Sequence, residues 1–350
     1  MEYKPDIQNV IRRYKAFWEK SIYDRAPIRI RYPVPGQSDQ EWTEACQSPE
    51  TYFAYHENVF RHRLELMDDA LPSATVDLGP GFMGGVMGCN VIFGNGTTWS
   101  EHCLKGWSDL DRFDQVAFDD TNPWVKRLKD LIAYFVEKSQ GKCAVGLALP
   151  LGPGDIMTAV RGPNEFCLDF YTAPDALKKL GEIATRAWIE VTQLQLDIIP
   201  PLEGGYCDNY EIWTPGRTSY FANDISVLIS ADTYREHLLA FDCEVAATLK
   251  TPWMHVHSGG ARLVPEFLTI PGLKGIQIVN DRPAGPTLKE LVPILKEVQK
   301  HRCLLLRKYS MAELEEIIGE LSPEGLHIDT QCGSLEEAKK ILEAWNQRQW

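Results

Sequence analysis

The segment Trp253-Met254-His255-Val256-His257-Ser258-Gly259-Gly260 is a short apolar run that ends in two histidines and then in small residues. Such a run is typical of a buried β-strand, in which residues two apart point to the same face. His255 and His257 therefore share one face, directly before the chain leaves the strand. Imidazole is a favoured zinc ligand, and a catalytic zinc needs about three protein ligands and one open position. The segment predicts a strand whose end carries two metal-binding side chains.

Strand-like and helix-like segments alternate along the chain on both sides of this run. We predict eight strands, at 74–78, 143–149, 203–207, 218–222, 253–257, 275–279, 303–306 and 326–330. Helical patterns occupy most of the intervals between them. This alternation is typical of a parallel sheet, and eight such units predict a closed (β/α)8 TIM barrel. Residues 1–350 form one domain in this interpretation, with a mainly helical N-terminal layer (1–70) packed on the barrel proper (71–350).

Composition narrows the classes of partner and compartment. The net charge of −13 argues against nucleic acid and anionic membranes as partners. No run approaches the roughly 18 apolar residues of a membrane span, and the first residues lack the pattern of a signal peptide. The nine cysteines are odd in number and irregularly spaced, which does not indicate a disulfide framework. We therefore expect a cytoplasmic protein.

We expect a third metal ligand after the last strand of the predicted barrel. Reactive groups of such barrels lie at the carboxyl ends of the strands, and Cys332 follows the last predicted strand. We predict that His255, His257 and Cys332 bind the metal, and that Asp208 or Asp224 supplies an oxygen ligand. Without the barrel, these would be ordinary hydrogen-bonded histidines and a small buried cysteine. The barrel favours the metal site.

Polar and glycine-rich segments follow the other predicted strands. We predict catalytic roles for Asp208, Asp224 and Tyr309, and substrate binding by Tyr206, Asn209, Arg282 and Arg307. The segment 79–84 matches the pattern G-x-G-x-x-G, but no helix-like pattern follows it, which disfavours a dinucleotide site. We predict instead that Gly81, Gly84 and Gly154 line a pocket for a bulky planar or flexible cofactor.

Several segments resemble, in the same order, the uroporphyrinogen decarboxylase superfamily, especially its corrinoid-dependent methyltransferase branch. They are 144–162, 223–239, 254–260 and 325–334, and the resemblance extends over about residues 70–350. It implies a zinc-dependent methyltransferase that moves a methyl group between a corrinoid carrier and a small acceptor such as a thiol. It also implies Zn²⁺ and a corrinoid (cobalamin) as cofactors, the corrinoid being presented by a partner protein.

In that branch, a His-x-Cys pair and a distant cysteine bind the zinc, and Cys332 matches the distant cysteine. The His-x-Cys-Gly segment fits this chain in two registers. In the first, His257 is the family histidine and Gly259 stands where the cysteine should be. In the second, which matches one position fewer, His255 is the family histidine and His257 replaces the cysteine. Both registers lose a thiolate, so the metal would carry less negative charge from its ligands and be more Lewis acidic.

Two other functions stay open at this point. A decarboxylase or other lyase would use Asp208 or Asp224 together with the rim cations Arg282, Arg307 and Lys308. A non-catalytic member would bind a corrinoid, a tetrapyrrole or a partner protein. Uroporphyrinogen decarboxylation itself is disfavoured, because the segment 33–40 lacks the arginine-rich signature with which that family handles the substrate carboxylates.

Overall fold

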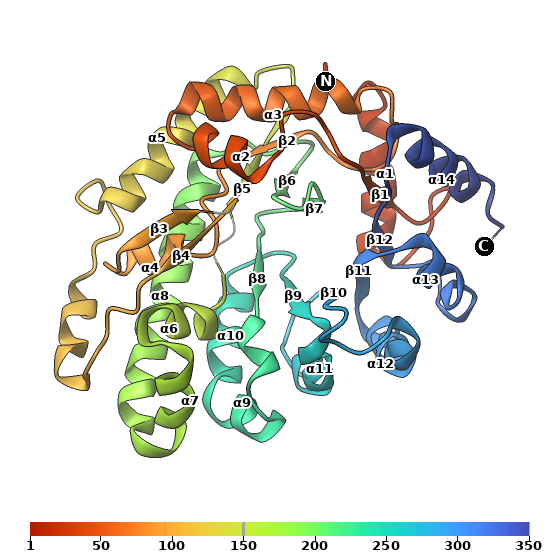
Figure 1. Ribbon diagram of the computed structural model, residues 1–350. Coiled ribbons are helices and arrows are strands. Elements are labelled where there is room, and N and C mark those ends of the chain that lie inside the picture. Colours follow the sequence, from red (N-terminus) through yellow and green to blue (C-terminus); the bar gives the residue numbers. More distant parts are fainter. Residues whose placement is uncertain (95, 149–150, 350) are drawn as a thin grey trace.

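The computed structural model describes residues 1–94, 96–148 and 151–349, and has helices around the outside of the strands (Figure 1). Its largest sheet has six parallel strands in the order β1 (Ile28–Arg31), β12 (Leu326–Gln331), β11 (Cys303–Tyr309), β10 (Gly275–Val279), β9 (Trp253–His257) and β8 (Tyr220–Ala222). A second sheet contains β2 (Ser73–Thr75), β5 (Ala144–Leu147), β6 (Gly205–Asp208) and β7 (Trp213–Pro215). The strands β3 (Val91–Gly94) and β4 (Thr97–Ser100) form an antiparallel hairpin. The fold is mixed α/β.

Every predicted strand overlaps a strand of the structure, and β9 and β10 have the predicted bounds. Leu149, the predicted end of one strand, lies outside the described residues. The predicted closed barrel is not confirmed, because the described strands outside the β3–β4 hairpin divide into two sheets without ladder pairing between them. One gap lies after β6, where the chain turns back as β7 and pairs antiparallel with β6, and the other lies between β1 and β2, which are edge strands of the two sheets. β1 comes from the predicted N-terminal layer but pairs with β12.

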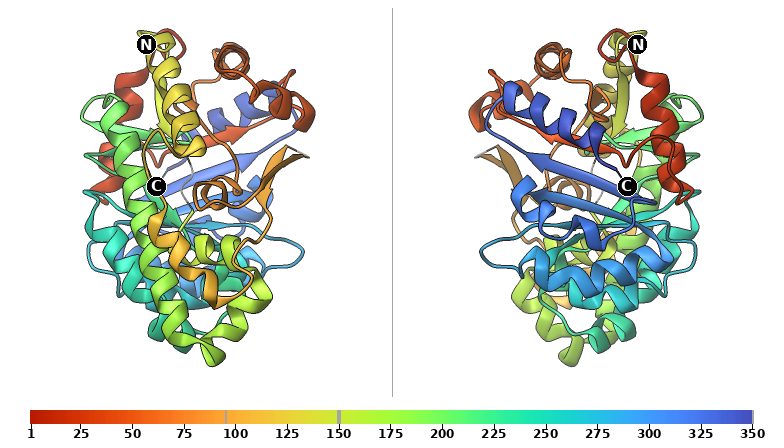
Figure 2. Two further views of the ribbon diagram at one scale, coloured as in Figure 1. Left: turned by 90° about the vertical axis from the view of Figure 1, so that its left-hand side faces the viewer. Right: turned by 90° about the vertical axis from the view of Figure 1, so that its right-hand side faces the viewer.

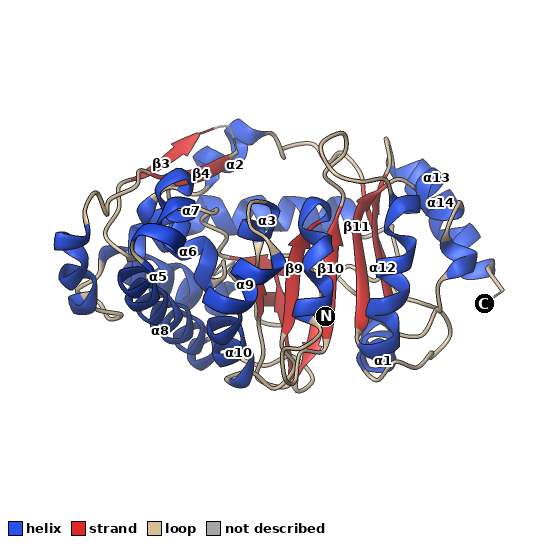
Figure 3. Cartoon of the chain, turned by 90° about the horizontal axis from the view of Figure 1, so that it is seen from below, coloured by secondary structure: helices blue, strands red, loops and turns tan. Residues whose placement is uncertain are grey.

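The helices pack outside the strands, on both sides of the sheets in the view from below (Figure 3). The α-helices are α1 (Ile7–Trp18), α2 (Asp39–Ala45), α3 (Pro49–Arg63), α4 (Phe82–Val86), α5 (Pro123–Lys138), α6 (Pro153–Arg161), α7 (Pro163–Thr172), α8 (Pro174–Ile198), α9 (Ala231–His237), α10 (Leu239–Ala247), α11 (Val264–Phe267), α12 (Leu288–His301), α13 (Met311–Glu315) and α14 (Leu335–Gln347). The 3-10 helices are η1 (Trp107–Gln115), η2 (Asp224–Val227), η3 (Ser258–Leu263) and η4 (Ile318–Glu320). Within the described ranges, none of the helices has the length and apolar character needed to cross a membrane.

Local sequence explains where the C-terminal helices begin. α12 starts after Thr287, whose hydroxyl accepts from the backbone N–H of Glu290 while the Glu290 carboxylate accepts from the backbone N–H of Thr287. α13 begins in the same way, with Ser310 and Glu313. Such capping boxes satisfy N–H groups that the first helical turn leaves free. They fix the residue at which each helix begins.

The two faces of β9 contact different parts of the core. Met254 and Val256 belong to the larger apolar cluster, whereas Trp253 packs in a second cluster with residues of α1 such as Phe17. Since residues two apart share a face, His255 and His257 lie on the side of Trp253. The start of this face is covered by α1, and its end is more open, because the side chain of His257 is 34% exposed.

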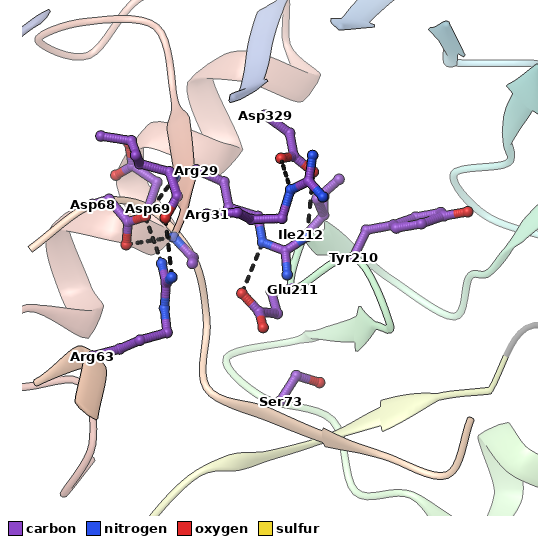
Figure 4. A network of polar contacts seen from close by, with 12 residues as sticks. Arg29, Arg31, Arg63, Asp68, Asp69, Ser73, Tyr210, Glu211, Ile212 and Asp329 are labelled. Atoms are coloured by element: carbon purple, nitrogen blue, oxygen red, sulfur yellow. Dashed lines mark hydrogen bonds and ion pairs between the residues drawn. The ribbon is translucent and has the colours of Figure 1, made fainter. Parts of the chain in front are cut away.

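A buried ion network joins β1, β12 and β11, the three strands at one edge of the large sheet (Figure 4). Asp329 of β12 accepts from Arg29 at 3.3 Å, from Arg31 at 2.7 Å and from Arg307 at 3.1 Å. Arg29 also donates to Glu211 at 2.9 Å. Burial alone would raise the pKa of Asp329, but the three guanidinium groups lower it well below its usual range. The network therefore holds an ionised carboxylate inside the protein.

A disulfide joins Cys89 and Cys103, which lie on either side of the β3–β4 hairpin. The hairpin brings them together because the Glu101 N–H donates to the Asn90 carbonyl, just beyond the paired ends of its strands. Sequence spacing did not indicate this bridge, since the pairing depends on the hairpin and not on a regular cysteine pattern. The side views show the hairpin, in orange, at the periphery of the molecule (Figure 2).

Candidate metal centre

Asp224, His255 and His257 each offer one ligand atom within 4.8 Å of the others. Asp224 begins η2 directly after β8, and β8 pairs with β9, so the carboxylate lies beside the two histidines of the neighbouring strand. Its Oδ1 lies 3.8 Å from His255 Nε2 and 3.5 Å from His257 Nε2. These distances exceed those of ordinary N–H···O hydrogen bonds. The three atoms therefore surround a point without bonding to one another.

Each imidazole is held from its other nitrogen. His255 Nδ1 lies 2.6 Å from Gln277 Oε1, and Gln277 is opposite His255 in the β9–β10 register. His257 Nδ1 lies 2.6 Å from Asp281 Oδ1. An oxygen acceptor at Nδ1 places the proton there and leaves the lone pair on Nε2. Both Nε2 lone pairs are thus free for a ligand beside Asp224, which is how metal-binding histidines are usually oriented.

The charges at the centre favour a cation. Burial and the positive charge of Arg307 lower the pKa of His255 to about 3, so this imidazole is neutral at neutral pH. Burial, with the nearby charge of Asp281, raises the pKa of Asp224. The Asp224 side chain is 46% exposed as a whole, yet Oδ1 is buried and has no hydrogen-bond partner. A buried carboxylate oxygen without a hydrogen-bond partner, beside the neutral imidazole of His255, fits a bound metal ion, which needs deprotonated ligands.

Asp155, in the first turn of α6, holds the backbone that carries Asp224. Its carboxylate accepts from the backbone N–H groups of Asp224 at 3.1 Å and Ile225 at 2.8 Å. Burial and the negative charge of Asp224 raise the pKa of Asp155. Removing Asp155 would leave two N–H groups at the start of η2 without acceptors. Asp155 is therefore a positioning residue for the Asp224 ligand atom.

Asn223 fixes the chain on the other side of Asp224. Its side-chain amide donates to Asp242 Oδ2 at 2.7 Å, and the Tyr234 hydroxyl donates to the same oxygen at 2.7 Å. Burial raises the pKa of Asp242 to about 7. The folded protein therefore holds a proton on Asp242 at pH values where the unfolded chain has lost it, and this contribution to stability falls as pH rises from about 4 to 7.

We expect Asp242→Asn to remove that part of the pH dependence. In the wild type, the free energy of unfolding should fall between pH 4 and pH 7 by up to about 4 kcal/mol through this group. The variant keeps an oxygen acceptor for Asn223 and Tyr234 but does not titrate. Urea unfolding at several pH values measures both slopes, with the exposed Asp130→Asn as control. Equal slopes in the Asp242→Asn variant and the wild type would contradict the assignment.

Two cavities meet at Asp224. The first, of about 380 Å³, is lined by Pro80, Thr98, Trp99, Ser100, His102, Leu151, Asp155, Thr158, Ala159, Asp224, Ile225 and Leu228. The second, of about 500 Å³, is lined by Asp224, Val227, His257, Gly259, Asp281, Arg282, Ala284 and Gly285. Both volumes fall within the range of small-molecule sites. A ligand in either cavity lies next to the candidate metal centre.

Cys332, the predicted third metal ligand, is not part of this group. Its thiol donates to the Ser334 carbonyl at 3.3 Å, and its backbone N–H donates to the Arg31 carbonyl at 2.8 Å. Both contacts hold it at the end of β12, beside β1. Asp224, which the sequence offered as an oxygen ligand, is the residue that the structure places beside both histidines.

The predicted residues on β6 and after it are engaged with their surroundings. Asp208 Oδ1 accepts from the backbone N–H groups of Tyr210 and Ile212, and burial raises the Asp208 pKa to about 7. Asn209 accepts from the Tyr220 hydroxyl at 2.6 Å. The Tyr206 hydroxyl donates to the Leu196 carbonyl of α8, away from the histidines. None of these three is among the residues that line the two cavities described above.

The remaining predicted residues differ in how they relate to the centre. Arg282 lines the second cavity. Arg307 stacks on Tyr210, with Cζ 4.2 Å from the ring centroid, and Tyr309 is fully buried with a hydroxyl that has no partner. The predicted pocket glycines also pack closely: a Cβ would lie 2.3 Å from Ser100 Oγ on Gly84, 2.7 Å from the Trp99 carbonyl carbon on Gly81, and 3.0 Å from Ile225 Cγ2 on Gly154.

Three residues of this centre escaped prediction as functional residues. Gln277 is a polar residue inside the apolar strand Gly-Ile-Gln-Ile-Val, and that polarity is a usable signal for a partner on the next strand. The Tyr210 hydroxyl lies 3.1 Å from His255 Nδ1, and Asp155 is part of a glycine-rich turn. Neither Tyr210 nor Asp155 has a sequence signal, because their roles depend on how separate segments meet.

Neither protein-family models nor curated proteins match this sequence. Among solved structures, a methyltransferase from Methanosarcina mazei is similar to it, with a TM-score of 0.67 at 13% sequence identity. The similarity covers 97% of this chain and 98% of that chain. At this identity the similarity shows a shared fold. The resemblance to the uroporphyrinogen decarboxylase superfamily rests on the sequence segments given above.

Proposed function

We propose that this protein is a metal-dependent methyltransferase that moves a methyl group between a corrinoid carrier and a small acceptor such as a thiol. The observation that carries the proposal is the centre formed by Asp224, His255 and His257, with both Nε2 atoms directed at one unpartnered carboxylate oxygen. The fold supports it, because a methyltransferase has a similar one. We propose further that the two sheets together form a (β/α)8 barrel around this centre.

The donor set fits zinc. Two imidazole nitrogens and one carboxylate oxygen are a common ligand set of catalytic zinc, in which the fourth position stays open for substrate. Asp224, His255 and His257 would hold the metal, and Arg282 and the two cavities would surround the open side. When bound, the metal supplies a positive charge that lowers the pKa of a thiol or similar acceptor.

The chain's own residues orient the ligands and limit water. Gln277 and Tyr210 fix the His255 ring, and Asp281 fixes that of His257. Asp281 Oδ2 also accepts from the Ser258 hydroxyl and from the Gly259 N–H, both at 3.3 Å, so the carboxylate cannot turn away. Such outer partners set ligand basicity and geometry. His255 is only 5% exposed, which keeps bulk water from that side of the centre.

Metal content tests this assignment. We expect the purified wild type to bind about one zinc per chain and His257→Ala to lose it, because two ligands remain where about three are needed. Cys332→Ala should keep the metal, since its thiol is bonded elsewhere. Elemental analysis after dialysis against zinc measures all three proteins. A His257→Ala protein that keeps stoichiometric zinc, or a Cys332→Ala protein that loses it, would contradict the assignment.

Activity is measured separately, with methylcobalamin and a panel of thiols. Demethylation that stops on chelation and returns with zinc supports the proposed reaction. Turnover of a carboxylic acid substrate that survives chelators would instead support the lyase alternative.

A further inference from the structure

The cavity between the β3–β4 hairpin, α6 and η2 has a nearly apolar wall despite its polar residues. Ser100 Oγ donates to the Ala159 carbonyl, and His102 Nδ1 lies 3.1 Å from the same oxygen. Thr98 Oγ1 donates to the Leu78 carbonyl, and Thr158 Oγ1 donates to the Gly154 carbonyl. Each of these hydroxyl groups donates its hydrogen to a carbonyl of the protein backbone. The protons of these hydroxyl groups are therefore not available to donate to a ligand.

The buried polar atom of this wall that lacks a hydrogen-bond partner lies at one end of the cavity. Asp155 accepts from two backbone N–H groups, whereas the buried Oδ1 of Asp224 has no hydrogen-bond partner among the described residues. Apolar side chains, including Leu151, Ile225 and Leu228, line other parts of the cavity. A ligand here would place its body against apolar wall and its one polar group beside Asp224, at the candidate metal centre.

Charge narrows the class of ligand further. No lysine or arginine is among the described residues that line this cavity, while two carboxylates, Asp155 and Asp224, are. A carboxylate or phosphate against this wall would be desolvated without a cationic partner, and an ammonium group there, away from Asp224, would lose its hydration as well. The volume of about 380 Å³ lies at the low end of small-molecule sites, which suits a ligand of one or two rings and not a corrin macrocycle.

We propose that this cavity binds the small acceptor of the methyl transfer, and that the acceptor is an uncharged molecule with an apolar body and a single thiol or hydroxyl group directed at Asp224. This inference rests on the proposed function, which leaves the chemical class of the acceptor open. The corrinoid carrier would then approach from the second cavity, on the His257 side of Asp224.

Three probes of similar size and different charge test the cavity: 4-methylbenzyl alcohol, 4-(hydroxymethyl)benzoate and 4-(aminomethyl)benzyl alcohol. Their binding to the metal-free full-length protein is measured by calorimetry. We expect the neutral alcohol to bind at least about tenfold more tightly than either charged probe. Its para methyl group can pack on the apolar wall, whereas the carboxylate and the ammonium group would lose their hydration there. Tighter binding of the anion or of the cation would overturn the proposal.

A matched pair of variants locates the bound probe. Leu228 lines the cavity and is 55% exposed, and Leu168 on α7 is 62% exposed and lines neither cavity, so both tolerate a charged replacement. Leu228→Glu should weaken the neutral probe at least about tenfold, and Leu168→Glu should leave it unchanged. Equal effects of the two variants would overturn the location.

The metal readout is independent of these measurements. A protein that binds the neutral probe but no zinc refutes the metal centre and leaves the cavity assignment intact. A protein that binds zinc but prefers the anionic probe refutes the acceptor class and leaves the metal centre intact.

Discussion

Asp224→Asn should make the metal-free protein more stable and the metal complex much weaker. The pKa of Asp224 is raised by burial and by the Asp281 charge, so ionising this group opposes folding as pH rises above about 4. An uncharged amide removes that cost. Because the side chain is partly exposed, we expect a gain of only about 1 kcal/mol at pH 8. The same change takes a negative ligand from the metal, and zinc affinity should fall by more than about 100-fold.

Opposite signs of the two effects distinguish a metal ligand from a structural residue. A structural carboxylate would destabilise the protein when replaced and leave zinc affinity alone. Asp281→Asn is the matched control, because Asp281 holds His257 without belonging to the ligand group. Its zinc affinity should fall by about 10- to 100-fold, as for other outer partners. Thermal unfolding without metal and competitive zinc titration give both quantities. Unchanged zinc affinity in Asp224→Asn would exclude it as a ligand.

The histidine pair could be predicted because it depends on one strand. The period of two along β9 places His255 and His257 on one face whatever lies around them. The polar residue Gln277 in the next strand carried a similar signal that only the β9–β10 register turns into a contact. The third ligand was harder to predict, because Asp208, Asp224 and Cys332 all follow strands. Choosing between them requires knowing which strands are neighbours.

Sheet order explains why Cys332 lies apart. β12 is separated from β9 by β11 and β10, so the strand axes are about 14 Å apart at ordinary strand spacing. In a regular closed barrel such strands face one another across the mouth, and this geometry underlay the prediction. Here the described strands outside the β3–β4 hairpin form two sheets, with β7 beside β6 at one gap and no ladder between β1 and β2 at the other. Alternation of strands and helices predicts the units, but not how β7 interrupts their closure.

Asp329→Ala should cause the largest loss of stability among the substitutions considered. The carboxylate is 2% exposed and pairs with Arg29 and Arg31 of β1 (Figure 4). It also pairs with Arg307 of β11. Without it, three guanidinium groups remain close together, and Glu211, which accepts from Arg29, is the acidic group left beside them. Breaking a buried ion pair from one side costs about 3–5 kcal/mol. Since the pKa of Asp329 is lowered, its contribution is present at neutral pH and is lost as pH falls below about 4.

Urea unfolding at pH 7 and at acid pH measures this loss. Asp130→Ala, which breaks an exposed pair with Lys126, is the control and should cost less than about 1 kcal/mol. The effect should also reach the metal centre, because Arg307 stacks on Tyr210 and the Tyr210 hydroxyl lies beside His255 Nδ1. At pH 7 and low urea, where Asp329→Ala is still folded, we therefore expect weaker zinc binding. A cost below about 1 kcal/mol, in the range of exposed pairs, would show that the arginines find other partners.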